Sequence, residues 1–253
     1  MLSLSPIAYV KTSFKEKFGV PRQSGMIAEA RGVIKFIPDP NFRDALRGLE
    51  AFSHLWIIFH FHAHFQGEAG QAGPAGKDGE VWRPLISPPR LDGPKRVGVL
   101  ASRSPDRPNR LGLSVVKIES IHLDAKDGIE IEVSGVDLLD GTPVLDIKPY
   151  LPYVDIVSDA SGAWTASEIP KYEVSFSNNA ISQLADGKLS SSYKNLLIKM
   201  LELDPRPTSQ KKVYSIMDEK NDGRSFAFRL DEFDVKWEIR NQGIWVRELT
   251  PLN

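Results

Sequence analysis

Short apolar segments separated by turn residues are the feature that most limits how this chain can fold. Turn sequences such as "KDG" and "DGTP" interrupt β-branched and aromatic runs through the first two thirds of the chain. Many short strands with few helices predict a barrel or a sandwich. One short helix is predicted at 41–49. The predicted strands are Ile7–Val10, Gly32–Ile37, Leu55–Phe65, Arg96–Ala101, Val115–Leu123, Ile129–Val136 and Val144–Ile147.

After Pro170 the pattern changes to that of a small α+β domain. Apolar residues recur at helical spacing in "SSYKNLLIKMLELDPRP", and Asp204-Pro205 predicts the end of that helix. The apolar face of the helix consists of Tyr193, Leu196, Leu197, Met200 and Leu201. Four strands then follow, with "NDG" and "NQG" as turns. They are predicted at Val213–Met217, Phe226–Leu230, Val235–Ile239 and Ile244–Leu249.

Composition excludes several classes of protein. The chain has no cysteine, so disulfides, thiolate zinc sites and cysteine nucleophiles are excluded, and a reducing cytoplasm is expected. No cationic leader precedes an apolar run, and no 18 uncharged apolar residues stand together, so we expect neither export nor a membrane span. A formal net charge of −1 argues against a wholly basic nucleic-acid-binding domain.

Locally, however, positive charge is concentrated in one loop region. Between Arg90 and Arg110 six basic residues face two acidic ones. Within it, "ASRSPDRPNRLGLS" contains two prolines that hold the loop extended, and its arginines Arg103, Arg107 and Arg110 offer guanidinium forks suited to carboxylate or phosphate. This stretch predicts an anion-binding loop, with a solvated turn between strands as the alternative.

Three further stretches stand out. Glycine recurs every third residue from 67 to 79, which predicts a flexible surface loop because so few units cannot form a collagen helix. The "GVPRQSG" loop at 19–25 offers hydrogen-bond donors to a ligand. In "DLLDGTPVLDIKPYLPY" a tight turn precedes Asp146 and Lys148 on one strand face, which indicates a functional strand or a surface ion pair.

Alternation in "HLWIIFHFHAHF" places His60, His62 and His64 on one strand face. Imidazole is a common metal ligand, so a metal site is one interpretation. Same-face residues of a strand lie about 6.6–7 Å apart, so three of them reach one ion only if the strand bends. A polar pocket wall is the other interpretation. No G-x-S-x-G, H-E-x-x-H or P-loop motif occurs.

Taken together, the motifs resemble the TrmO family of tRNA methyltransferases, also called TsaA-like or UPF0066. The resemblance spans nearly the whole chain and includes "FKEKFGVPRQSG", "GLEAFSHLWIIFHFH", "ISPPRLDGPKRVGVLASRSPDRPNRLGLS", "DLLDGTPVLDIKPYLPY" and "LELDPRP", in that order. It implies an S-adenosylmethionine-binding β-barrel at 1–165, a C-terminal α+β domain at 170–253 that docks tRNA, and a cytoplasmic homodimer. The implied reaction is N6-methylation of threonylcarbamoyladenosine beside the anticodon of threonine tRNA.

The resemblance also implies where the cofactor is bound. The expected contacts are Pro21, Arg22, Gln23, His62, Ala63, Arg103, Leu113, Leu139, Asp140, Gly141 and Thr142. No catalytic residue is assigned, because in-line orientation of the nitrogen and the activated methyl supplies much of the acceleration without a strong base. No metal is expected.

For the tRNA we expect contacts from Arg107, Arg110, Asp146, Lys148 and Arg206. Arg206 stands between Pro205 and Pro207, which predicts an extended and exposed side chain. Two alternatives stay open at this stage: a non-catalytic RNA- or anion-binding protein on the same fold, and a metal-dependent hydrolase using His60, His62 and His64.

Overall fold

The computed structural model describes residues 3–63, 82–88, 95–186 and 189–252, so the glycine-rich stretch at 67–79 lies outside the described residues. Contacts divide the chain into two compact units. The first comprises Met1–Val10, Ile34–Glu132 and Gly141–Ala166, and the second comprises Lys11–Val33, Val133–Asp140 and Ser167–Asn253. The sequence-based division at 165–170 does not anticipate that 11–33 and 133–140 group with the C-terminal residues.

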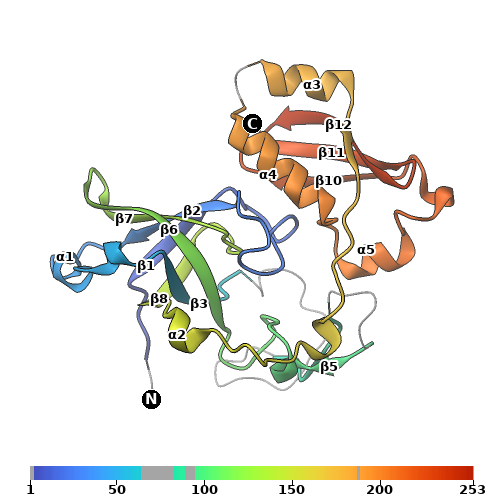
Figure 1. Cartoon of the computed structure of the whole chain (residues 1–253). Coiled ribbons are helices and arrows are strands. Elements are labelled where there is room, and N and C mark those ends of the chain that lie inside the picture. Colours follow the sequence, from blue (N-terminus) through green and yellow to red (C-terminus); the bar gives the residue numbers. More distant parts are fainter. Residues whose placement is uncertain (1–2, 64–81, 89–94, 187–188, 253) are drawn as a thin grey trace. The chain divides into compact units, whose positions relative to one another are not determined.

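A closed barrel confirms the predicted mainly β fold class (Figure 1). Its strand order is β1-β2-β7-β6-β3-β8, and it closes where β1 pairs with β8 through Ala8 opposite Val144. The barrel strands are β1 Ala8–Thr12, β2 Arg31–Phe36, β3 His54–His60, β6 Leu111–Ala125, β7 Gly128–Ser134 and β8 Thr142–Pro149.

Shorter elements complete this part of the chain. The predicted helix at 41–49 is limited to α1 Phe42–Ala45 and a 3-10 turn at Leu49–Ala51. The predicted strand at 96–101 is reduced to β5 Val97–Gly98, which pairs with β4 Leu85–Ile86 and continues as a 3-10 turn. A last short helix, α2, spans Pro152–Asp155.

The strand predicted over 55–65 ends early, at His60. Its alternation is confirmed up to that point, because Leu55, Ile57 and Phe59 are buried while the residues between them are half-buried. The ladder with β6 ends there, because His60 lies opposite Leu111, which is the first residue of β6. The prediction that His62 belongs to this strand is therefore wrong.

The second unit contains a four-stranded sheet in the order β10-β11-β12-β9, accompanied by three helices (Figure 1). Strand β9 is parallel to β12, and the other pairs are antiparallel. Asn241 and Gln242 have φ of 51° and 58° and form a two-residue hairpin between β11 and β12. The elements are β9 Val174–Phe176, α3 Asn178–Ala185, α4 Ser191–Glu202, α5 Thr208–Val213, β10 Ser225–Leu230, β11 Phe233–Arg240 and β12 Gly243–Pro251.

The amphipathic helix was predicted correctly and one strand was not. All five residues of the predicted apolar face of α4 are buried, and the Ser190 side chain caps the helix by accepting from Tyr193 N. The strand predicted at 213–217 is wrong, because α5 occupies 208–213 and Tyr214 N donates to Gln210 O. Only Ile216 of that stretch is buried, so no strand face exists there.

The contact between Phe59 and Gly112 generates a test of barrel packing. These residues lie opposite one another on β3 and β6, and a Cβ added at Gly112 would stand 2.1 Å from Phe59 Cζ. We expect Gly112→Ala to lower the free energy of unfolding by about 1–3 kcal/mol, since the ring must move within a packed core. Urea denaturation measures the change. Gly98→Ala is the control, because among the described residues, its chain neighbours aside, no atom lies within 4 Å of a Cβ added there. Equal effects of both substitutions would contradict the packing argument.

Candidate functional site

Strand register places several predicted site residues on one outer face of the barrel. Ile58 on β3 lies opposite Leu113 on β6 and opposite Asp146 on β8. Directly opposed residues share a sheet face, so the predicted cofactor residue Leu113 and the predicted tRNA residue Asp146 flank Ile58. Leu113 is 52% exposed, which leaves an apolar surface available to a ligand.

Lys148 belongs to the same face, opposite Trp56. Its Nζ lies 3.1 Å from Asp146 Oδ2, so the surface ion pair considered from the sequence is present. The lysine side chain keeps 63% of its surface exposed. An exposed pair of this kind contributes little to stability, so both side chains can exchange partners at low cost.

The turn at 139–142 lies close to the end of β3. Gly141 has φ of 76°, which favours glycine, and a Cβ at this position would lie 3.9 Å from His62 Nε2. Gly141 N donates to Val10 O at 2.8 Å, which fixes the turn against β1. The structure therefore brings the predicted residues His62 and Gly141 together.

Asp140 holds the same turn with its side chain. Its carboxylate accepts from Thr12 N at 3.0 Å and from Lys15 Nζ at 3.1 Å. Burial alone would raise the pKa of Asp140, but the Thr12 hydrogen bond and the nearby Lys15 and Lys11 ammonium groups outweigh it and hold the pKa below its ordinary value. The carboxylate is thus engaged within the turn, and Asp140 N also donates internally, to Phe14 O at 2.8 Å.

The arginine-rich loop is organised by its own side chains. Arg107 donates from Nε to Ser104 O at 3.0 Å and from an Nη to Ser102 O at 2.5 Å. Ser104 N donates to Ser102 Oγ, and Asp106 N donates to Ser104 Oγ. The guanidinium of Arg107 therefore braces the loop, whereas Arg103 is exposed.

Arg110 has φ of 50° and connects the arginine-rich loop to the end of β3. Its N–H donates to Arg107 O, and its carbonyl accepts from Phe61 N at 2.9 Å. Of the three predicted histidines, His64 lies outside the described residues. Among residues 3–63, 82–88, 95–186 and 189–252, no group of three His, Asp or Glu side chains is arranged to hold a metal ion.

In the second unit, Arg22 reaches the "LDPRP" segment. Its Nη2 donates to Arg206 O at 2.8 Å, while Pro21 is buried and Gln23 Nε2 donates to Arg22 O. Burial lowers the pKa of Arg22, and Asp204 partly opposes this shift. Arg22 as a whole residue is exposed even though its guanidinium donates to Arg206 O.

The prediction that Arg206 is exposed is wrong. Its side chain is 3% exposed, and it donates from Nε and Nη2 to the two carboxylate oxygens of Asp204 at 2.7 and 2.8 Å. Nη1 donates to Tyr214 O, and the guanidinium carbon lies 4.6 Å from the centre of the Phe226 ring. Asp204 has φ of 51°, which turns the chain so that the side chains of Asp204 and Arg206 meet.

A residue that the sequence did not reveal completes this group. Lys211 Nζ donates to Leu203 O at 3.4 Å and lies 3.9 Å from Asp204 Oδ2. We call Arg22, Asp204, Arg206 and Lys211 the Asp204 cluster. The only sequence signal was the spacing of one acidic and two basic residues over 204–211, which does not distinguish a cluster from a solvated helix face.

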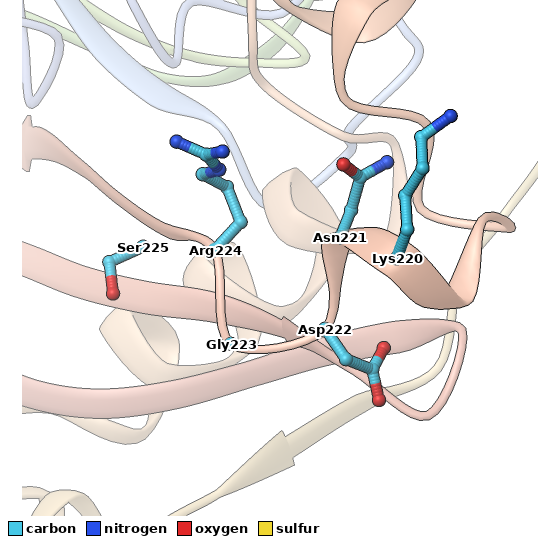
Figure 2. A pocket seen from close by; sticks show the side chains of 6 residues that line it. All are labelled: Lys220, Asn221, Asp222, Gly223, Arg224 and Ser225. Carbon is cyan, nitrogen blue, oxygen red and sulfur yellow. The ribbon is translucent and has the colours of Figure 1, made fainter.

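A hollow of about 440 Å³ lies nearby in the chain, lined by residues 220–225 (Figure 2). Figure 2 shows Lys220, Asn221 and Arg224 pointing to one side of the turn and Asp222 pointing to the other. The Arg224 guanidinium carbon lies 4.3 Å from the centre of the Tyr214 ring, whose main chain accepts from Arg206. Basic side chains thus extend from the Asp204 cluster to this hollow.

Comparison with known proteins gives matches over nearly the whole chain. Residues 9–156 match the tRNA-methyltransferase O N-terminal domain, and residues 169–252 match the TrmO C-terminal domain. The tRNA (adenine(37)-N6)-methyltransferase of Escherichia coli K12 is 39% identical over 97% of this chain and 96% of its own length.

Two further comparisons concern the cofactor and the fold. A Pyrococcus abyssi protein, described as a probable S-adenosyl-L-methionine-binding protein, is 34% identical over 68% of this chain and 81% of its own length. The crystal structure of TrmO from Pseudomonas aeruginosa superposes with a TM-score of 0.73 at 33% identity, covering 99% of this chain and 98% of that chain. Within the described ranges, no helix is both long enough and apolar enough to cross a bilayer.

The burial of Arg206 generates a stability test. We expect Arg206→Ala to lower the free energy of unfolding by about 3–5 kcal/mol, because the Asp204 carboxylate stays buried without its partner. Chemical denaturation followed by circular dichroism measures the change. The double variant Asp204→Asn/Arg206→Met removes both charges and should recover most of the loss.

Arg229→Ala is the matched control, since this arginine is exposed on β10 and its contact with Glu16 uses only the main-chain N–H. An Arg206→Ala protein as stable as the wild type would contradict the buried pair.

Proposed function

Because the chain belongs to the TrmO family, we infer that it is an S-adenosylmethionine-dependent tRNA methyltransferase that modifies N6 of an adenine. The observation that carries this conclusion is the pair of family matches, at 9–156 and 169–252, together with a relative of that activity aligned along nearly the full chain. The closed barrel agrees with it, because the fold is that of a solved TrmO structure.

We propose a specific substrate as well: threonylcarbamoyladenosine beside the anticodon of threonine tRNA. The enzyme is proposed to act as a cytoplasmic homodimer. The family resemblance of the motifs supports these details, and the E. coli relative is named for adenine 37. The position of the adenine and its modification state are separate questions.

The residues of the barrel have the chemistry that the cofactor requires. Exposed leucines at 111 and 113 offer apolar surface for an adenine ring, and Arg103 offers a fork for a carboxylate. The glycine turn at 141 provides main-chain groups beside His62. When bound, S-adenosylmethionine supplies an activated methyl group.

We propose that the chain holds the cofactor mainly through main-chain and orienting contacts. The Asp140 carboxylate accepts hydrogen bonds from Thr12 and Lys15, so it would hold the turn at 139–142 in position for the cofactor. No general base is assigned, since positioning the adenine nitrogen accounts for much of the rate. The proposed cofactor contacts are Pro21, Arg22, Gln23, His62, Ala63, Arg103, Leu113, Leu139, Asp140, Gly141 and Thr142.

For tRNA, we divide the expected residues into direct contacts and residues that act indirectly. We propose Arg110, Asp146 and Lys148 as direct contacts, supported by the 63% exposure of the Lys148 side chain. Arg107 and Arg206 would act indirectly, because their guanidinium groups hold the arginine-rich loop and the Asp204 cluster. Phosphate contacts of this kind position the tRNA without selecting its sequence.

The decisive experiment is mass spectrometry of nucleosides from threonine tRNA after incubation with the protein and S-adenosylmethionine. A mass gain of one methyl on threonylcarbamoyladenosine is expected. Methylation only of unmodified adenine would contradict the proposed substrate. Salt-sensitive tRNA binding without any methylated product would instead indicate the non-catalytic RNA-binding alternative.

Substitution of Arg103 tests the cofactor site. We expect Arg103→Ala to weaken S-adenosylmethionine binding or turnover more than tenfold, because a charge-assisted contact is worth about 1.5–3 kcal/mol. Isothermal titration calorimetry and single-turnover methylation measure the two effects. Arg47→Ala, which removes a side chain that is 80% exposed near α1, serves as the control. Wild-type binding and turnover in Arg103→Ala would show that this arginine does not contact the cofactor.

A further inference from the structure

The Asp204 cluster carries more positive than negative charge. Among its described members, three are cations and one is a carboxylate. Arg206 uses its Nε and Nη2 groups on Asp204, so both carboxylate oxygens already have a strong partner. Lys211 lies 3.9 Å from Oδ2 and otherwise donates to a main-chain carbonyl, and Arg22 also donates to a carbonyl.

The surroundings of Lys211 therefore disfavour the charged form of its side chain. Only 15% of its side chain is exposed, and burial lowers its pKa to about 8. Asp204 opposes this shift, while the nearby charges of Arg22 and Arg206 lower the pKa further. Tyr172 also lies near Asp204 and Arg206, and burial raises the pKa of its hydroxyl, so it stays neutral and offers no second negative charge.

We propose that Lys211 and Arg22 bind a backbone phosphate of tRNA, with Asp204 and Arg206 as positioning residues. This inference rests on the proposed function, because it takes tRNA as the ligand. One phosphodiester carries one negative charge, which offsets part of the positive excess, and a guanidinium with an ammonium is a common pair for phosphate. The bidentate contact between Arg206 and Asp204 fixes the segment that Arg22 and Lys211 both touch.

Neighbouring residues favour a polynucleotide over a single small anion. Lys212 is exposed next to Lys211 on α5, and Lys220 and Arg224 point to one side of the turn beside the hollow (Figure 2). A row of basic side chains matches a row of phosphates, whereas a free phosphate ion needs only one site.

The first test compares two adjacent lysines. We expect Lys211→Met to weaken binding of a threonine anticodon stem-loop RNA about tenfold and to reduce the slope of log K against log salt by about one unit. Lys212→Met is the matched control and should change both quantities less. Neither variant should alter the affinity for S-adenosylmethionine. Equal effects of the two substitutions, or none for Lys211→Met, would overturn the proposal.

The second test measures the protonation of Lys211 when RNA binds. At pH 8 a group with a pKa of about 8 is half protonated, so phosphate contact should take up about half a proton. Calorimetry of the RNA in two buffers of different ionisation enthalpy measures this uptake. We expect it in the wild type and in Lys212→Met, and we expect it to vanish in Lys211→Arg, which stays charged while keeping affinity. Uptake with inorganic phosphate but not with RNA would overturn the assignment to a tRNA phosphate.

The free protein provides an independent readout. The pKa of Lys211 in the folded protein is about 8, below its unfolded value of about 10.4. Between these two pH values the unfolded chain binds more protons than the folded protein. The contribution of Lys211 to the free energy of unfolding therefore rises as pH increases from about 8 to 10.5. Lys211→Met should remove that rise without unfolding the protein. If Lys211→Met behaves as the wild type toward RNA while methylation proceeds, only this inference fails; absence of tRNA binding and methylation in the wild type would mean that the proposed function fails.

Discussion

Closure of the barrel between β1 and β8 is the constraint on which the arrangement of the site residues depends. The pairing of Ala8 with Val144 completes the hydrogen-bonded ring, so the barrel strands have no open edge in the part of the chain that the structure describes. Closure also fixes the turn at 139–142, because Gly141 N binds Val10 O. Residues on neighbouring strands then have only one register, which is why Leu113, Ile58 and Asp146 share a face.

Much of this arrangement could be predicted from alternation, and the errors have physical causes. Leu55 to Phe59 alternate because one face is packed, but alternation alone cannot show that β6 begins opposite His60 and that β3 ends there, before His62. The stretch at 213–217 has strand-like residues, yet it contains a single buried side chain and begins at the last residue of a helix. Strand formation depends on partners, which a sequence does not display.

The arginines show the same limit for site prediction. Arg103, Arg107 and Arg206 look alike in sequence, and each stands in a motif that predicts a ligand contact. In the structure Arg103 is exposed, Arg107 binds carbonyl groups of its own loop, and Arg206 binds Asp204 in a buried pair. Proline on both sides of Arg206 does stiffen the chain, but the positive φ of Asp204 decides which way the side chain faces. That φ angle is set by the tertiary structure, so the sequence motif alone does not predict it.

The parallel strand β9 has a consequence for the order in which the protein is made. Ser177, just after β9, bonds to Arg247, a residue 70 positions later in the chain. At a synthesis rate of about 5–20 residues per second, β9 leaves the ribosome several seconds before β12 can pair with it. During that interval the main-chain N–H and C=O groups of β9 that later bond to β12 are unpaired, and the apolar face of α4 is not yet covered by the sheet. Every barrel strand has already been synthesised by then. The C-terminal sheet is thus completed last, and its segments are the part of the nascent chain most exposed to wrong pairing.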